Sequence, residues 1–304
     1  APVGYTVSDV GVGDVDGDTV DDVVIHHLGA NAFCVLYGHN LSGDETIEGL
    51  SGTNHACVSG VDTVLSALGL TGSKLGFHAQ GLGDINGDGL SDFAVTGLTG
   101  ASGAEGFAVV YLGVQGDGPD LSNPNIILRG AQAGSKPAMA CSAGNFNGDT
   151  HPVNGNPIYD IGFGSPEDDT FVVLSGNSDW SSAGTQDLVI NISQPGDITA
   201  NALYQVTAQY PGLQLRLGEK CGPAGNILPT PDGAVATDDV LAADITSSGD
   251  VRLFLIPGRT TVDTSATITD HEGALSAEDA LVVRLGQDAP GITGGFASEF
   301  YGDV

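Results

Sequence analysis

The chain contains the run Asp84-Ile85-Asn86-Gly87-Asp88-Gly89-Leu90-Ser91-Asp92, which is followed directly by the apolar residues Phe93-Ala94-Val95. Side-chain oxygens stand at positions 1, 3, 5 and 9 of this run, and a backbone carbonyl is available at position 7. Glycines between the polar residues allow the backbone to curve sharply. The pattern predicts a tight acidic turn that leads into a β-strand.

The same turn occurs elsewhere in the chain. A full copy comes earlier, as Asp14-Val15-Asp16-Gly17-Asp18-Thr19-Val20-Asp21-Asp22. A partial copy comes later, as Asn145-Phe146-Asn147-Gly148-Asp149, and here the aspartate of position 9 is Asp160, displaced by an insertion of seven residues. We call these runs turn one, turn two (Asp84–Asp92) and turn three in chain order.

Alternate oxygen ligands in a tight loop are what a hard cation requires, because Ca²⁺ takes six to eight oxygens. An EF-hand is excluded, since position 12 is Ile25 or Val95 within a predicted strand rather than a bidentate glutamate. Metal-free turns of the same composition remain the alternative, although clustered carboxylates repel one another without a cation. The interpretation predicts two calcium sites and a weaker third one. The predicted ligands are Asp14, Asp16, Asp18, Val20, Asp22, Asp84, Asn86, Asp88, Leu90, Asp92, Asn145, Asn147, Asp149 and Asp160.

Each turn precedes a hairpin of two short apolar strands, of which the second ends in glycine, and the hairpin occurs five times. The hairpins begin at Asp22, Asp92, Asp160, Asp239 and Asp279, and the spacing leaves room for two further strands per copy. Repeated four-stranded antiparallel units are typical of a β-propeller. We therefore predict an all-β fold: a single propeller-like domain over residues 1–304, with about five blades. The repeats are expected at residues 5–45, 75–115, 138–178, 228–260 and 266–304.

The segment from Leu75-Gly76-Phe77 through turn two to Val95 resembles the FG-GAP repeat, the blade unit of the integrin α-subunit propeller and of many microbial surface proteins. Ile161-Gly162-Phe163-Gly164-Ser165-Pro166 is similar to the second half of that repeat. The resemblance covers residues 5–176 well. It implies that the turns bind structural calcium ions and that the protein is an extracellular module for adhesion or assembly.

The charge balance argues against nucleic acids and anionic membranes as partners. With 8 Lys and Arg against 38 Asp and Glu in 304 residues, the formal net charge is −30. A nucleic acid or an anionic membrane surface needs a basic patch, and the few basic residues are scattered singly. No apolar run approaches the roughly 18 residues that would predict a membrane-spanning helix.

Three further features favour an exported protein. The sequence begins without methionine, which is consistent with removal of an export signal. Its four cysteines, Cys34, Cys57, Cys141 and Cys221, are even in number and lack a zinc-type spacing. Of the three possible pairings we favour Cys34 with Cys57 and Cys141 with Cys221, with free thiols as the alternative. Asn40 and Asn191 each lie in an N-glycosylation sequon.

The sequence indicates no catalytic residue, because the histidines form no metal cluster and no acid pair is distinguished by its spacing. We therefore expect a non-enzymatic, secreted calcium-binding module in cell-surface adhesion or in an extracellular layer or filament. It would bind a protein or glycan at the cell exterior, or assemble with itself. The alternative is a carbohydrate-binding or polysaccharide-degrading propeller, which the aromatic content of 6% with a single tryptophan disfavours.

Overall fold

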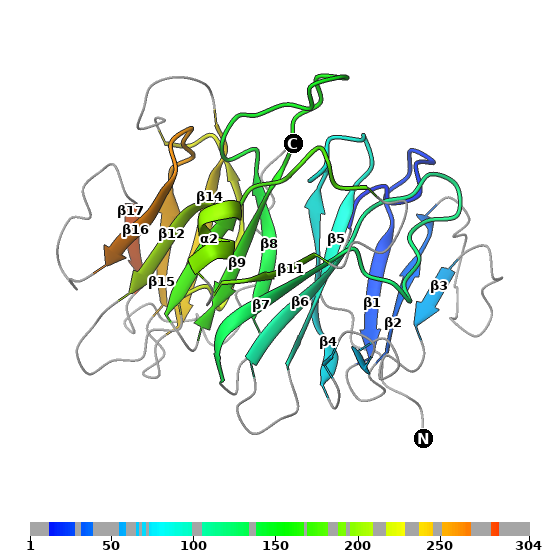
Figure 1. Ribbon diagram of the computed structural model, residues 1–304, viewed down its shortest axis with the longest axis horizontal. Coiled ribbons are helices and arrows are strands. Elements are labelled where there is room, and N and C mark those ends of the chain that lie inside the picture. Colours follow the sequence, from blue (N-terminus) through cyan, green and yellow to red (C-terminus); the bar gives the residue numbers. More distant parts are fainter. Residues whose placement is uncertain are drawn as a thin grey trace.

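The computed structural model describes most of the chain. The described residues are 12–27, 32–38, 55–58, 65–66, 69–70, 73–98, 105–133, 138–166, 169–181, 188–192, 195–208, 217–228, 237–245, 251–268 and 281–285. They form four open β-sheets, which follow one another from right to left in sequence order in Figure 1. The predicted all-β fold is therefore confirmed.

The first two sheets contain the N-terminal part of the chain. The first sheet is an antiparallel array of β1 (Val23–His27), β2 (Ala32–Leu36) and β3 (His55–Val58). The second is an antiparallel meander of β4 (Lys74–Gly83), β5 (Asp92–Leu98), β6 (Glu105–Tyr111) and β7 (Ile126–Ala133). In the second sheet β4 and β7 are the two strands for which the repeat spacing had left room.

The third and fourth sheets repeat this arrangement. The third contains β8 (Met139–Gly144), β9 (Asp160–Ser165), β10 (Thr170–Leu174) and β12 (Ala202–Ala208) in antiparallel order. The short helix α2 (Pro195–Asn201) directly precedes β12. The fourth contains β13 (Lys220–Gly225), β14 (Asp239–Ile245), β15 (Val251–Ile256) and β17 (Leu281–Leu285).

The first four predicted hairpins are all present, as β1–β2, β5–β6, β9–β10 and β14–β15. The fifth predicted repeat, residues 266–304, is described only in part. Its leading strand is β17, which pairs with β15 and completes the fourth sheet. Short apolar strands carry the same pattern whether they open a unit or close one, so the sequence did not distinguish the two. The remainder of that repeat lies outside the described residues.

Two strands leave their own unit to join the preceding sheet. The strand β11 (Leu188–Asn191) lies between β10 and β12 in sequence but pairs in parallel with β7 of the second sheet. The strand β16 (Asp263–Ile268) lies between β15 and β17 but pairs in parallel with β12 of the third sheet. These additions tie the second sheet to the third unit and the third sheet to the fourth unit by backbone hydrogen bonds.

Three apolar clusters fill the spaces between neighbouring sheets. Along β5, Phe93 and Val95 point into the cluster shared with the first sheet, whereas Ala94 points into the cluster shared with the third. A further cluster joins the third and fourth sheets through residues such as Phe171 and Phe254. Because the second and third sheets are covered on both faces, their strands are continuous apolar runs rather than alternating ones.

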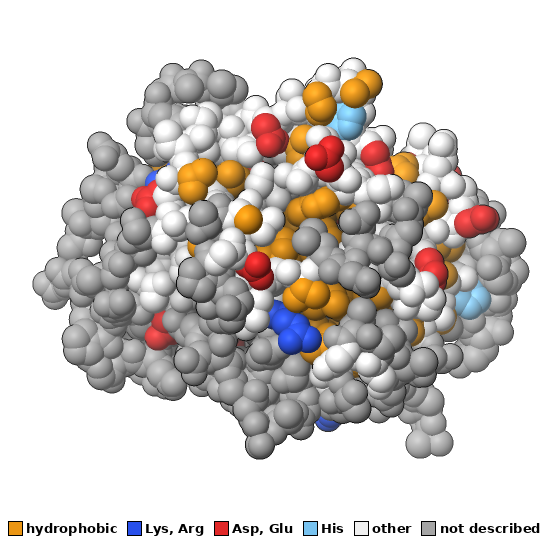
Figure 2. All heavy atoms as spheres, viewed as in Figure 1, with side chains coloured by type: hydrophobic (Ala, Val, Ile, Leu, Met, Phe, Trp, Pro, Cys, Tyr) orange, Lys and Arg blue, Asp and Glu red, His pale blue; other side chains and the backbone are white. Residues whose placement is uncertain are grey.

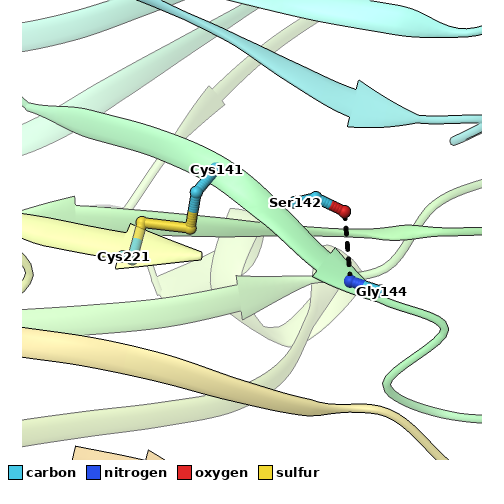
Figure 3. The surroundings of a disulfide bond; sticks show 4 residues. All are labelled: Cys141, Ser142, Gly144 and Cys221. Carbon is cyan, nitrogen blue, oxygen red and sulfur yellow. Dashed lines mark hydrogen bonds between the residues drawn. A yellow bond between two sulfur atoms is a disulfide. The ribbon is translucent and has the colours of Figure 1, made fainter. Parts of the chain in front are cut away.

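Both favoured disulfides are present. The Cys34–Cys57 bond joins facing residues of β2 and β3 within the first sheet. The Cys141–Cys221 bond joins β8 to β13 and so connects the third sheet to the fourth (Figure 3). Beside it, the Ser142 Oγ accepts a hydrogen bond of 3.1 Å from the Gly144 N–H.

We expect the Cys141–Cys221 bond to stabilise the fold more than the Cys34–Cys57 bond. The former closes a separation of 80 residues and the latter one of 23 residues. In the chain-entropy model this difference amounts to roughly 1 kcal/mol in the free energy of unfolding. Urea unfolding of the Cys141→Ala/Cys221→Ala and Cys34→Ala/Cys57→Ala proteins measures it, and equal midpoints would contradict the expectation.

In the described part of the chain, no helix combines the length and the apolar character needed to cross a bilayer.

Candidate metal centre and sheet junctions

A β-bridge between Gly13 and Asp22 closes turn one, and strand β1 follows directly after it. Its carboxylates organise the loop by accepting backbone hydrogen bonds. Asp14 accepts from Gly17, Asp18 and Thr19, at 2.7, 3.0 and 2.8 Å. Such contacts hold the side chains of positions 1, 3 and 5 toward the inside of the turn.

Three of the predicted ligands in turn one converge. Each of Asp14, Asp16 and Asp18 offers a carboxylate oxygen, and these oxygens lie within 4.8 Å of one another. Among the described His, Cys, Asp and Glu residues, this is the one group of three with that geometry. Three carboxylate oxygens suit a hard divalent cation such as Ca²⁺. The group could hold a metal ion, with the remaining coordination supplied by backbone carbonyls or water.

Turn two has the same backbone path but a different set of side-chain contacts. Asp84 again accepts from the loop, at 3.0 Å from the Asp88 N–H and 2.7 Å from the Gly89 N–H. The Asn86 amide donates to the Asp88 carboxylate at 2.9 Å. The structure therefore brings Asp84, Asn86 and Asp88 onto one loop, and because position 3 is an asparagine, this loop lacks the three-carboxylate group of turn one.

Turn three keeps the loop despite its insertion. Residues 150–157, which contain most of the insertion, form a small hairpin closed by a bridge between Thr150 and Pro157. Asn147 donates to the Asp149 carboxylate at 2.9 Å. The Asn145 Oδ1 and Asp149 Oδ1 atoms are both buried and accept no hydrogen bond from a described residue. Two buried oxygens of this kind are suitable ligands for a cation.

The aspartate of position 9 has a different role from the other predicted ligands. Asp22, Asp92 and Asp160 are fully buried, and so is Asp239, the equivalent residue of the fourth sheet. We call these four residues the anchor aspartates. In each of them one carboxylate oxygen accepts from the second residue of its own turn, and the other accepts from a glycine at the end of the following hairpin. Those glycines, the anchor glycines, are Gly38, Gly113, Gly176 and Gly258.

The anchor bonds are short and nearly the same in all four sheets. The bonds from the glycine N–H groups measure 3.0, 2.8, 2.9 and 2.9 Å in chain order. The bonds from the turns come from Val15, Ile85 and Ile227 at 2.8 Å each, and in turn three from Asn147 at 3.2 Å together with Phe146. Sequence reasoning missed this function. Its signal was the glycine that ends each hairpin together with the aspartate that begins it.

Each turn is also the junction between one sheet and the next. The residue before the anchor aspartate donates to the carbonyl of turn position 1 in the preceding unit, and the residue after the anchor glycine donates to the carbonyl of position 2. The donor and acceptor pairs are Ser91 to Asp14, Val114 to Val15, Tyr159 to Asp84, Asn177 to Ile85, Asp238 to Asn145 and Arg259 to Phe146, at 2.8–3.1 Å.

The close approach at these junctions explains the anchor glycines. A Cβ at Gly176 would collide with the carbonyl oxygens of Tyr159 and Ile85. A Cβ at Gly113 would lie 2.7 Å from the Ser91 carbonyl oxygen and 3.2 Å from that of Val15. Only glycine allows the end of the hairpin to approach the preceding turn this closely. The anchor glycine therefore serves both the anchor bond and the junction.

Burial shifts the pKa values of these carboxyl groups upward. Desolvation is the largest cause for every anchor aspartate, and backbone hydrogen bonds oppose it. The pKa of Asp22 is raised to about 6, and the pKa values of Asp92 and Asp160 are raised well above their usual range. Burial therefore makes the ionised form of these groups less favourable in the folded protein than in water.

We expect the metal-free protein to be less stable at about pH 7.5 than at about pH 5. A carboxyl group whose folded pKa exceeds its unfolded pKa stabilises the fold below the unfolded value, and this contribution is lost as the pH rises through the folded value. For Asp22 the window runs from 3.8 to about 6. Melting curves of calcium-depleted protein at both pH values measure the effect, and Asp22→Asn should reduce it. A melting temperature that rises toward pH 7.5 would contradict the expectation.

The predicted glycosylation sites are placed only in part. Asn191 lies at the end of β11, where it is partly buried and its N–H donates to the Asp197 carboxylate at 2.8 Å. Asn40 lies outside the described residues.

No family model matches this chain, and a search of curated proteins finds no significantly similar relative.

Proposed function

We propose that this chain is a calcium-stabilised propeller-type module that acts without enzymatic activity at the cell exterior, as an adhesive or structural subunit. The observation that carries the proposal is the position of the acidic turns. They lie at the junctions between successive sheets, and in turn one Asp14, Asp16 and Asp18 bring three carboxylate oxygens within 4.8 Å of one another. A cation bound there would fix the loop on which the next sheet rests.

The arrangement of the sheets supports the propeller part of the proposal. The opening strands β4, β8 and β13 of successive units contact one another, and each sheet packs face to face with its neighbours. Radial repetition of four-stranded antiparallel sheets is how propellers are built. The FG-GAP pattern of turns one and two agrees with this interpretation.

The disulfides and the acidic surface, rather than a targeting sequence, support a location outside the cell. Two disulfides favour an oxidising environment. Figure 2 shows acidic side chains at separate places over the visible face, while basic side chains are sparse. An acidic surface of this kind is suited to a medium rich in salt or divalent cations, which screen the repulsion between its charges.

Two measurements test the proposed function. Isothermal titration with Ca²⁺ should give two or three binding sites. A titration that detects no binding would contradict the proposal that calcium stabilises the module. A glycan array and a polysaccharide-degradation screen test the non-enzymatic part. We expect no hydrolysis, and reproducible cleavage of any polysaccharide would replace the proposal with the carbohydrate-active alternative.

A further inference from the structure

The junction between sheets is made three times in the described chain. Each junction has an accepting half, which is a turn, and a donating half, which is the following sheet. Each half also occurs once without a described partner. We call the segment between β13 and the anchor aspartate Asp239 turn four. Its position 1 is Asn226, because Gly225-Asn226-Ile227 corresponds to Gly83-Asp84-Ile85 at the start of turn two. The Ile227 N–H donates to the anchor aspartate of its unit, as the Ile85 N–H does in turn two. The described start of turn four therefore repeats the anchor bond that position 2 makes in the turns that support a following sheet.

The exposed fractions show that no described sheet rests on the start of turn four. The apolar residue of position 2 is 0% exposed in each of the first three turns, where it is Val15, Ile85 or Phe146. In turn four the equivalent residue is Ile227, which is 63% exposed. Within the described part of the chain, neither the Asn226 nor the Ile227 carbonyl accepts the junction hydrogen bonds that its equivalents accept.

The first sheet has the donating half of the junction without a described partner. Its anchor glycine Gly38 is partly exposed, whereas the other three anchor glycines are buried. Val20 stands two residues before the anchor aspartate and is 42% exposed, whereas Ile158 and Thr237, the equivalent residues of the third and fourth sheets, are 4% and 1% exposed. The Asp21 N–H, which corresponds to the junction donor of Ser91, makes no hydrogen bond to a described residue.

We propose that turn four of one copy of this chain docks on the first sheet of a second copy, as a head-to-tail repetition of the internal junction. The Asp21 N–H of one copy would donate to the Asn226 carbonyl of the other, and Ile227 would pack beside Val20 and Gly38. The proposal rests on the proposed role as a structural subunit and names its partner as the chain itself. Because the two halves differ, the contact is heterologous and can extend into a ring or a filament.

Charge and packing favour this partner over an unrelated one. The described start of turn four, Asn226-Ile227-Leu228, is uncharged, whereas the first sheet presents Asp21 and the acidic turn one. The described start of turn four therefore brings no further carboxylate against turn one. The net charge of −30 on each copy still opposes association, so we expect assembly to strengthen with ionic strength. Within the described residues, the first and fourth sheets make no substantial contact in one chain.

Sedimentation velocity over a range of protein concentrations in high salt with calcium tests the proposal. The unaltered chain should associate as its concentration rises, and Ile227→Asp should weaken association by at least about tenfold because it buries a charge in the contact. The matched control is Val153→Asp in the inserted hairpin of turn three, where the side chain is 88% exposed and outside the proposed contact. It should associate like the unaltered chain.

A mixing experiment distinguishes head-to-tail contact from other association. Ile227→Asp leaves the first sheet intact, and Val20→Arg leaves turn four intact, so each variant alone should remain monomeric while an equal mixture forms a one-to-one dimer. A chain that stays monomeric at every concentration, or an Ile227→Asp variant that associates normally, would overturn the proposal. The calcium dependence of melting in the Ile227→Asp protein reports the calcium proposal separately, since that variant needs no assembly.

Discussion

Removal of calcium should lower the melting temperature of this protein by roughly 5–10 °C for each occupied site. An ion that binds the folded turns and not the unfolded chain adds about 2.7 kcal/mol when its concentration is a hundred times its Kd. Each kcal/mol corresponds to about 2–4 °C for domains of comparable size. Differential scanning calorimetry with calcium and with EDTA measures the shift, and identical curves would refute calcium binding.

Matched variants assign the shift to individual turns. Asp88→Ala removes a full charge from turn two, so it should reduce the calcium-dependent part of the melting temperature more than Asn147→Ala in turn three. Asp14→Ala should remove the contribution of turn one, where three carboxylates converge. Asp117→Ala is the control, because Asp117 is exposed and outside the turns. The comparison uses the difference between calcium and EDTA, since Asp14 and Asp88 also accept backbone hydrogen bonds.

Asp239→Ala should destabilise the fold by about 2–4 kcal/mol, equally with calcium and with EDTA. The Asp239 carboxylate is buried and accepts from Gly258 at 2.9 Å, from Ile227 at 2.8 Å and from Leu228 at 2.6 Å. Alanine leaves the buried Gly258 N–H without its acceptor, which costs about 1–3 kcal/mol, and it also removes the two part-buried bonds from Ile227 and Leu228. Asp239 tests the anchor by itself because turn four carries no acidic pattern at its described start.

Urea denaturation measures this cost. Asp239→Asn keeps one acceptor oxygen and removes the buried charge, so it should cost less than alanine. Asp117→Ala should change the free energy of unfolding by no more than about 0.5 kcal/mol, as is usual for an exposed position. An Asp239→Ala protein as stable as that control would show that the anchor contributes nothing to the fold.

The hairpins and the acidic turns could be predicted from sequence because both depend on neighbouring residues. Alternating oxygens and glycines determine how turn two curves, and the apolar runs after Asp22, Asp92, Asp160 and Asp239 are long enough for one strand each. The same local signal also fitted the strand at Leu281–Leu285. Which sheet that strand completes depends on its pairing with β15, for which the sequence carries no local mark.

The role of the anchor aspartates was hidden for the same reason. Asp92 looked like one more oxygen of the turn, but its carboxylate accepts from Gly113, which lies 21 residues away. The junction bond from the Asn145 N–H to the Asp238 carboxylate spans 93 residues. Contacts of this separation exist only after the sheets have packed, because they depend on where the backbone of one unit meets that of another.

The sequence by itself determined the all-β class, the repeated hairpins and the positions of the acidic turns, since short-range patterns specify turns and strands. The tertiary structure alone decided that each anchor aspartate joins its turn to a glycine and that each of turns one to three supports the following sheet. The physical reason is burial. A carboxylate removed from water must find donors, and the donors that reach it are backbone N–H groups brought together by the packing of whole sheets.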